Sequence, residues 1–180
     1  MGGIVAITSA AFFLVLFQVP ACAKDLIQED GRWVHRSRGF SIADPTRSAA
    51  SGARWSAVPV EGSVLSFRES GGASMSLVQQ CGVLPDDLRL LARELLIGLD
   101  EREIIEEGPV SVGGAPGWRI AARARHEGRA VRLRAVTRRL GPCSVDFLLI
   151  APQQSPDLEA DFQGWWGSFR ASSAARGAEP

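Results

Sequence analysis

The stretch from Gly117 to Ile150 constrains the fold more than any other part of this 180-residue chain. From Trp118 the apolar residues occupy every second position and arginines stand between them, which is the pattern of a strand with one buried face. Glu127-Gly128 predicts a two-residue turn, and the alternation resumes at Val131. The segment therefore predicts an antiparallel hairpin.

The register of this hairpin follows from its turn. A two-residue loop places Ala124 opposite Val131, Ala122 opposite Leu133, and Ile120 opposite Ala135. Each apolar residue then meets an apolar partner across the strands. A second turn at Gly141-Pro142 leads into residues 143–150, which are apolar on both faces apart from Ser144 and Asp146 and so predict a central strand.

The rest of the chain predicts shorter strands and two helices. Alternating residues and turn signals indicate strands over residues 33–42, 54–60, 63–69 and 73–80, and one or two short strands over residues 102–112. Apolar residues at helical spacing predict a helix from Pro85 to Leu99, whose buried face is Leu88, Leu91, Ala92, Leu95 and Leu99. A second helix is expected after Ser155 as N-cap and Pro156 as its first residue, and it would bury Leu158, Phe162, Trp165 or Trp166, and Phe169.

These elements predict an α+β fold. We expect a single domain in which a mostly antiparallel sheet of about six to eight strands packs against two main helices. Residues 33–170 would form the domain, preceded by a leader over residues 1–23 and a linker over residues 24–32. Residues 171–180 are small and polar and are expected to be a disordered tail.

Residues 1–23 have the composition of an export signal. Ile4–Val19 is almost wholly apolar, carries no charge, and is shorter than the ~20 residues that a membrane span needs. Two cleavage patterns overlap behind it. Val19-Pro20-Ala21-Cys22 resembles a lipobox and predicts lipidation of Cys22, whereas Ala21-Cys22-Ala23 fits an A-x-A site and predicts a soluble protein that begins at Lys24. An uncleaved N-terminal anchor is the third interpretation.

The cysteines support export independently. Both cleavage patterns leave Cys81 and Cys143 in the domain, and an even pair in an exported protein favours a disulfide. Cys81 ends one expected strand and Cys143 begins another, as antiparallel neighbours would. The alternative is two buried free thiols.

The charge balance and the polar residues disfavour several functions. The chain has 20 basic and 20 acidic residues, so nucleic acid is not expected as a partner. His35 and His126 are the only histidines, and neither has a neighbouring ligand at metal spacing. No serine stands in a G-x-S-x-G motif. We therefore expect a protein that is not an enzyme and that uses no cofactor.

The arginines of the hairpin are the feature of most functional interest. Six of them share parity on the two strands and are expected on its outward face: Arg119, Arg123, Arg125, Arg132, Arg134 and Arg138. The register places Arg123 opposite Arg132, and such like charges destabilise a strand pair unless carboxylates relieve them. Residues 100–107 could supply that relief through Asp100, Glu101, Glu103, Glu106 and Glu107. The functional alternative is an acidic partner protein or an anionic envelope lipid.

Five segments resemble the PsbP-like and Mog-type superfamily, in particular its small bacterial envelope members. They are GFSIADP, VLSFRE, SVGGAPGW, GPCSVDFLLIAP and FQGWWGSFR, and the similarity spans about residues 33–170. The resemblance implies an α/β/α sandwich built on an antiparallel sheet. It also implies an accessory or binding role in a larger assembly, as in photosystem assembly or small-GTPase regulation, without catalytic residues. The cysteine pair and the arginine-rich hairpin depart from the best-known members.

These observations together predict a non-catalytic, lipid-anchored accessory protein exported to the bacterial envelope, in the periplasm or at the outer membrane, that binds an envelope protein. The alternative is a protein that binds a small apolar or anionic ligand in the cleft between sheet and helix.

Overall fold

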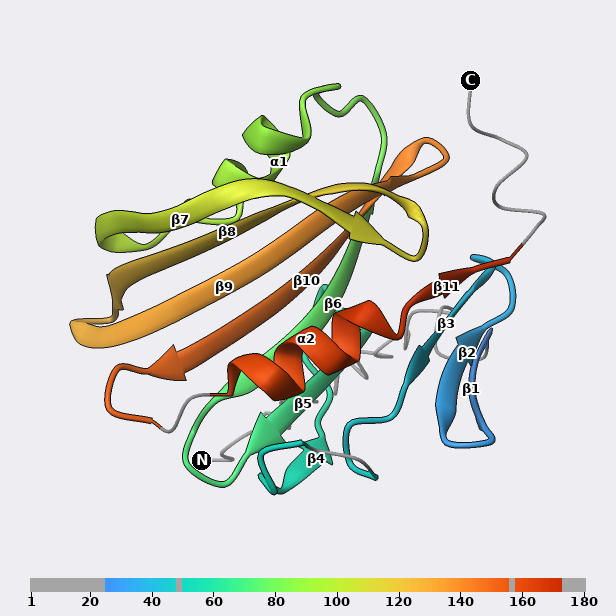
Figure 1. Cartoon of the computed structure of the whole chain (residues 1–180), viewed down its shortest axis with the longest axis horizontal. Coiled ribbons are helices and arrows are strands. Elements are labelled where there is room, and N and C mark those ends of the chain that lie inside the picture. Colours follow the sequence, from blue (N-terminus) through green and yellow to red (C-terminus); the bar gives the residue numbers. More distant parts are fainter. Residues whose placement is uncertain (1–24, 48–49, 156–157, 173–180) are drawn as a thin grey trace, which may run out of the picture.

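The structure is a computed structural model that describes residues 25–47, 50–155 and 158–172. Residues 1–24, which include the predicted leader and Cys22, and residues 173–180 lie outside the described residues. The described residues form two antiparallel sheets and two helices (Figure 1). The seven-stranded sheet contains, in spatial order, β4 (Trp55–Ala57), β5 (Leu65–Glu69), β6 (Ser74–Cys81), β10 (Cys143–Pro152), β9 (Arg129–Leu140), β8 (Ala115–His126) and β7 (Asp100–Val112). The four-stranded sheet contains β1 (Leu26–Glu29), β2 (Arg32–His35), β3 (Phe40–Ala43) and β11 (Arg170–Ala171).

The β8–β9 hairpin has the register that the sequence predicts. Ala124 pairs with Val131, Ala122 with Leu133, and Ile120 with Ala135. The turn works because Glu127 and Gly128 both have positive φ, at 49° and 76°, as a two-residue hairpin turn that matches the strand twist requires. β10 pairs with β9 on one side and with β6 on the other, so the prediction of a central strand is confirmed.

The two helices cover opposite faces of the large sheet. α1 (Leu88–Glu94) and the turns after it pack Ala92, Leu96 and Leu99 against the alternating apolar residues of β8 and β9. α2 (Glu159–Gly167) crosses the other face (Figure 1). Its Trp165 meets Phe67 of β5 and Phe147 of β10 edge-on, at ring-centroid distances of 5.7 and 5.9 Å. The arrangement is α+β and rich in strands.

Both helices are shorter than the sequence predicts. α1 begins after Asp87, whose side chain accepts a hydrogen bond from the Arg89 backbone N–H at 2.8 Å, and it gives way to turns after Glu94. α2 has Leu158 as N-cap, so the prediction of Ser155 in that place is wrong, and Pro156 lies outside the described residues. Leu91, Ala92 and Leu99 of the predicted α1 face are nevertheless buried, whereas Leu88 and Leu95 are only partly buried. In the predicted α2 face, Leu158, Phe162, Trp165 and Phe169 are buried as predicted.

The N-terminal part of the domain differs most from expectation. Residues 33–42 form β2 and β3 rather than one strand, because the chain reverses at residues 36–39 and Gly39 has a φ of 66°. The expectation of a linker over residues 24–32 is wrong, since Leu26 and Ile27 pair with His35 and Val34. Ala171, expected in the tail, pairs with Phe40. These strands make a second sheet where we expected only one.

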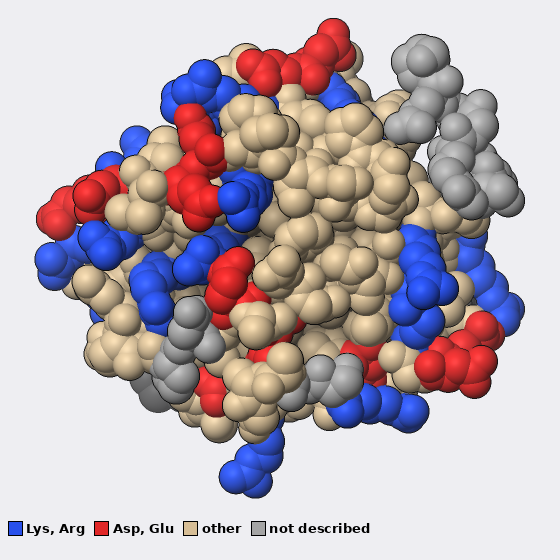
Figure 2. All heavy atoms as spheres, in the orientation of Figure 1, with Lys and Arg blue, Asp and Glu red and all other residues tan. Residues whose placement is uncertain are grey.

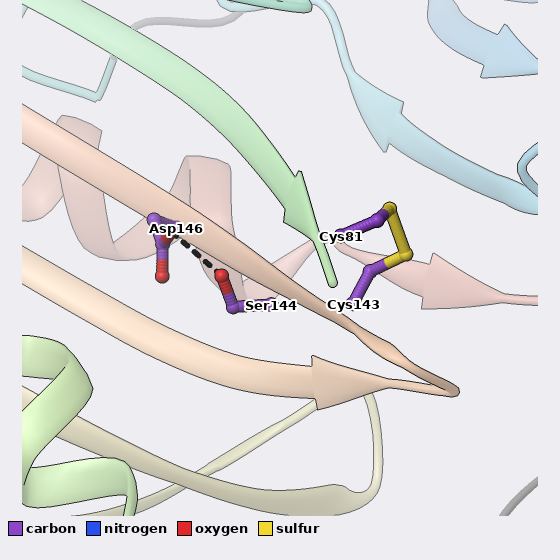
Figure 3. The surroundings of a disulfide bond; sticks show 4 residues. All are labelled: Cys81, Cys143, Ser144 and Asp146. Carbon is purple, nitrogen blue, oxygen red and sulfur yellow. Dashed lines mark hydrogen bonds between the residues drawn. A yellow bond between two sulfur atoms is a disulfide. The ribbon is translucent and has the colours of Figure 1, made fainter. Parts of the chain in front are cut away.

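Cys81 and Cys143 form a disulfide, as the sequence predicts. They lie directly opposite each other at the paired ends of β6 and β10, with an S–S distance of 2.03 Å (Figure 3). The bond closes a loop with a sequence separation of 62 that contains α1 and strands β7 to β9. A crosslink of this span removes conformational entropy from the unfolded chain.

We predict that reducing this disulfide lowers the free energy of unfolding by about 4 kcal/mol, because the unfolded chain regains the entropy of a long open loop. Urea denaturation with and without a phosphine reductant measures the change. The double variant Cys81→Ala/Cys143→Ala is the control, and its midpoint should not respond to the reductant. An unchanged midpoint in the wild type would contradict the prediction.

A buried carboxyl lies next to the disulfide on β10. Asp146 is 2% exposed and accepts a hydrogen bond from the hydroxyl of Thr137. It accepts a second one from the hydroxyl of Ser144 at 3.0 Å (Figure 3). Burial raises the pKa of Asp146, and the nearby charge of Glu94 raises it further, while the two hydroxyl donors oppose the shift. The ionised carboxylate is therefore less favourable in the folded state than in the unfolded state.

We predict that the wild type loses stability as the pH rises from the ordinary aspartate pKa of ~3.9 through the raised value, because the folded state binds the proton more tightly. Asp146→Asn cannot ionise and should remove this part of the pH dependence. Thermal unfolding across the acidic range compares the two proteins. A stability difference that does not vary with pH would contradict the prediction.

Candidate functional site

The arginine face is defined here as Arg119, Arg123 and Arg125 of β8 with Arg132 and Arg134 of β9. These residues alternate with the apolar positions that α1 covers, so their side chains belong to the opposite face of the sheet. Arg123 pairs directly with Arg132, as the predicted register requires. Five cations therefore lie close together on two neighbouring strands.

Carboxylates from the edge strand β7 lie against the β8 arginines. Arg119 forms an ion pair with Glu106, Arg123 lies 3.8 Å from Glu103, and Arg125 lies 3.7 Å from Glu101. Figure 2 shows the resulting alternation of basic and acidic atoms over this end of the molecule. Carboxylates from residues 100–107 therefore do lie beside the β8 arginines within the fold and reduce the repulsion among them, which was one of the two interpretations drawn from the sequence. These pairs are solvent-exposed, so each contributes at most about 1 kcal/mol to stability.

Glu107 forms ion pairs with arginines of α1 instead of with the arginine face. A β-bulge between Ile104 and Glu106 shifts the register of β7 and turns Glu107 toward α1. There the carboxylate accepts hydrogen bonds from Arg93 at 2.8 and 3.0 Å and pairs with Arg89 at 2.8 Å. The hydrogen bonds from Arg93 are the main cause that holds the pKa of Glu107 below its ordinary value. Glu107 thus fastens α1 to the sheet edge rather than relieving the arginine face.

The β9 arginines connect the face to α2. Arg132 donates a hydrogen bond to the Ser155 carbonyl at 2.6 Å, in the loop that leads to the helix. Arg134 pairs with Glu159 in the first turn of α2. Both side chains are partly buried, so these contacts position the helix in addition to balancing charge.

Arg138 is not part of the exposed face, and the expectation that placed it there is wrong. It is 2% exposed and donates to the carbonyls of Val112 and Arg139, both at 2.8 Å. Its guanidinium lies 5.4 Å from the centroid of the Phe169 ring. The parity of Arg138 is as predicted, but the segment after α2 covers this end of β9.

A shallow cleft lies between the arginine face and α2. Its lining includes Ala121 and Val136 from the sheet and Phe162 and Trp166 from the helix, with Arg119 and Arg134 among the charged residues beside them. Its volume is about 80 Å³. Pockets that enclose small-molecule ligands usually have several hundred Å³, so this cleft as it stands is too small to enclose one.

The two histidines lie on strands of different sheets, His35 on β2 and His126 on β8. His35 is buried against Phe40 at a ring-centroid distance of 5.4 Å, and burial lowers its pKa. His126 is exposed beside the β8–β9 turn. Within residues 25–47, 50–155 and 158–172, no three metal-ligating side chains are grouped together. None of the helices in the same residues is long and apolar enough to cross a membrane.

Comparison with known proteins identifies the fold. No protein-family model matches the sequence, and no curated protein is significantly similar to it. Among solved structures, the chain is similar to cyanobacterial PsbP (CyanoP) from Synechocystis, with 15% identity, 78% of this chain and 91% of that chain covered, and a TM-score of 0.50. It is also similar to a point mutant of protein Mog1, with 13% identity, 76% and 93% covered, and a TM-score of 0.53. The chain therefore has the PsbP/Mog-like fold that the sequence resemblance predicts.

We predict that Arg138→Ala lowers the free energy of unfolding by about 2–4 kcal/mol, because it leaves two carbonyls without their donor and opens space against Phe169. Arg123→Ala is the matched variant on the exposed face and should change it by less than about 1 kcal/mol. Urea denaturation of both variants measures the difference. Equal losses would contradict this distinction between the two arginines.

Proposed function

We propose that this protein is an exported, lipid-anchored, non-catalytic accessory protein of the bacterial cell envelope, and that it binds an envelope protein through the arginine face. The observation that carries the proposal is a row of exposed arginines whose counter-ions come from an edge strand. Arg119, Arg123 and their partners Glu103 and Glu106 are all about half exposed or more. Such pairs can separate at little cost when a partner offers carboxylates of its own.

The disulfide supports export. Cys81 and Cys143 are bonded within the domain, and disulfides persist in oxidising compartments such as the bacterial periplasm. The apolar leader and the lipobox-like residues that end at Cys22 support a lipid anchor. The likeness to PsbP and Mog1 concerns the fold, and we extend to this chain the accessory role that the resemblance implies.

An acidic partner fits the geometry of the face. Arg123 and Glu103 are 3.8 Å apart, beyond ordinary hydrogen-bond length, so the guanidinium retains donors for a partner carboxylate. The cleft beside Arg119 offers an apolar edge from Trp166 and Val110 that a protein side chain could cover. Charged residues around a small apolar centre are a common arrangement at protein interfaces.

The second candidate is a small apolar or anionic ligand held in the cleft between α2 and the sheet. Phe162, Trp166 and the two rim arginines supply suitable groups. A volume of about 80 Å³ means that α2 would have to move for a ligand to be enclosed. The exposed arginine face needs no such movement, so protein binding is the proposal we favour.

We predict that Arg119→Glu/Arg123→Glu abolishes capture of the partner, because the face then repels carboxylates. Cross-linking in the native cell, followed by purification and quantification of co-purified envelope proteins, measures capture. Arg54→Glu/Arg68→Glu makes the same charge change at two exposed arginines elsewhere and should leave capture intact. Glu103→Gln/Glu106→Gln removes the competing carboxylates and should strengthen capture several-fold.

Melting temperatures of the variants provide the control for folding. Loss of capture in both arginine double variants, or weaker capture in the glutamine variant, would refute the arginine face as the binding site. The intact mass of the purified protein tests the anchor. An acylated N-terminal Cys22 supports it, and an unmodified protein that begins at Lys24 refutes it.

A further inference from the structure

The start of the described chain lies at one particular end of the small sheet. Leu26, the first residue of β1, pairs with His35, the last residue of β2. The Arg36 backbone N–H donates to the Asp25 carbonyl at 3.1 Å. The chain therefore enters the domain beside the turn of residues 36–39 that joins β2 to β3.

The C-terminal strand of the described chain, β11, lies at the same end of the small sheet. Ala171 of β11 pairs with Phe40, and the Ser172 backbone N–H donates to the Gly39 carbonyl at 2.7 Å. Arg170 pairs with Ser41, and Ser41 also pairs with Val34, so these three side chains share the sheet face that points away from the core. The sequence shows none of this, because the two segments are far apart in the chain.

Arginines gather at this end. Arg36 and Arg38 lie in the turn, Arg170 lies on β11, and Arg32 lies further along the same outer face. Figure 2 shows basic atoms over the part of the molecule where β3 and β11 lie in Figure 1. Asp25 and Glu29 balance part of this charge, and Glu29 pairs with Arg36 at 2.8 Å.

Of the two arginines that line the groove described below, Arg170 is the one whose guanidinium has no counter-ion in the described residues. Arg32 is already held by the Ser168 carbonyl at 2.7 Å and by the Ser41 hydroxyl at 3.2 Å. Burial and, second, the nearby charge of Arg170 lower the pKa of Arg32. The Arg170 side chain is exposed and has no hydrogen bond or ion pair with any residue in the described part of the chain. Two guanidinium groups that repel each other lie over one face, and an anion bound between them would relieve this repulsion.

An open groove lies at this position. It has a volume of about 260 Å³, and its lining includes Val34, Arg36, Gly39, Ser41, Arg170 and Ser172. The lining thus includes an apolar residue (Val34), a hydroxyl-bearing residue (Ser41) and two arginines (Arg36 and Arg170). Guanidinium groups bind phosphate oxygens through paired N–H donors, so the groove has suitable chemistry for a phosphodiester.

We propose that this groove binds the phosphate of an anionic phospholipid headgroup and lays the small sheet against the membrane that carries the anchor. The inference rests on the proposed lipidation of Cys22. Only four residue steps separate Cys22 from Leu26, and a fully extended chain of that length spans at most about 14 Å. Attraction between basic residues and anionic lipids falls off over about 8–10 Å. A tether of at most about 14 Å restricts how far the start of β1 can move from the membrane, and the groove lies at that end of the small sheet.

The test uses the mature protein, purified from the envelope in zwitterionic detergent and examined by native mass spectrometry. Equimolar phosphatidylglycerol and phosphatidylcholine are offered together, and inorganic phosphate is offered in a separate sample. We expect phosphatidylglycerol to be retained about fivefold or more over phosphatidylcholine. Arg170→Glu should bring this ratio close to one, and Arg170→Gln should give an intermediate ratio. Arg68→Glu makes the same charge change on β5 and should keep the wild-type ratio.

Two outcomes would refute the groove as the headgroup site. An unchanged ratio in Arg170→Glu would remove the groove as the headgroup site. Retention of inorganic phosphate without any lipid preference would assign it to a free anion. The anchor and the arginine face are tested separately, by the intact mass of the same sample and by partner capture. An unacylated protein that still prefers phosphatidylglycerol through Arg170 would refute the anchor and leave the groove as a lipid site.

Discussion

The structure depends on the pairing of β10 with two neighbours while both of its faces are buried. Phe147 faces Trp165 of α2 and Phe169 beyond it, with ring centroids 5.9 and 5.4 Å away. Leu148 and Ile150 point the other way and pack against the cluster beneath α1. Because one strand contributes to both layers, the two helices are fixed on opposite sides of a common sheet. The disulfide at Cys143 then ties the start of this strand to β6.

Ion pairs between β7, β8 and α1 stabilise the edge of the large sheet. β7 is a 13-residue edge strand, and an exposed edge of that length invites pairing with other chains. Its glutamates, its irregular register and Pro109 all oppose such pairing. The same glutamates balance the arginines of β8, and Glu107 fastens α1. One acidic strand thus protects the edge of the sheet and balances a dense row of cations on β8.

The two proposed surfaces lie on different parts of the molecule and use arginine differently. On β8 and β9 the arginines have acidic neighbours that a protein partner would have to replace. On the small sheet Arg170 has none in the described residues, and it borders a groove at the place where the chain enters the domain. A protein attached to a membrane at Cys22 could therefore rest on its small sheet while the large sheet presents the arginine face.

The sequence by itself determined the elements whose pattern repeats along a single segment. Alternation and turn chemistry specify the β8–β9 register, and Cys81 and Cys143 stand at strand ends that can meet. Only the tertiary structure decided what depends on contacts between distant segments. Arg138 has the same parity as Arg134, yet it is buried because the chain after α2 returns over it. The second sheet gains its fourth strand because Arg170 and Ala171 pair with β3 across more than half of the chain. The pattern within a segment specifies which side chains share a face, whereas what covers that face depends on long-range packing that local periodicity does not encode.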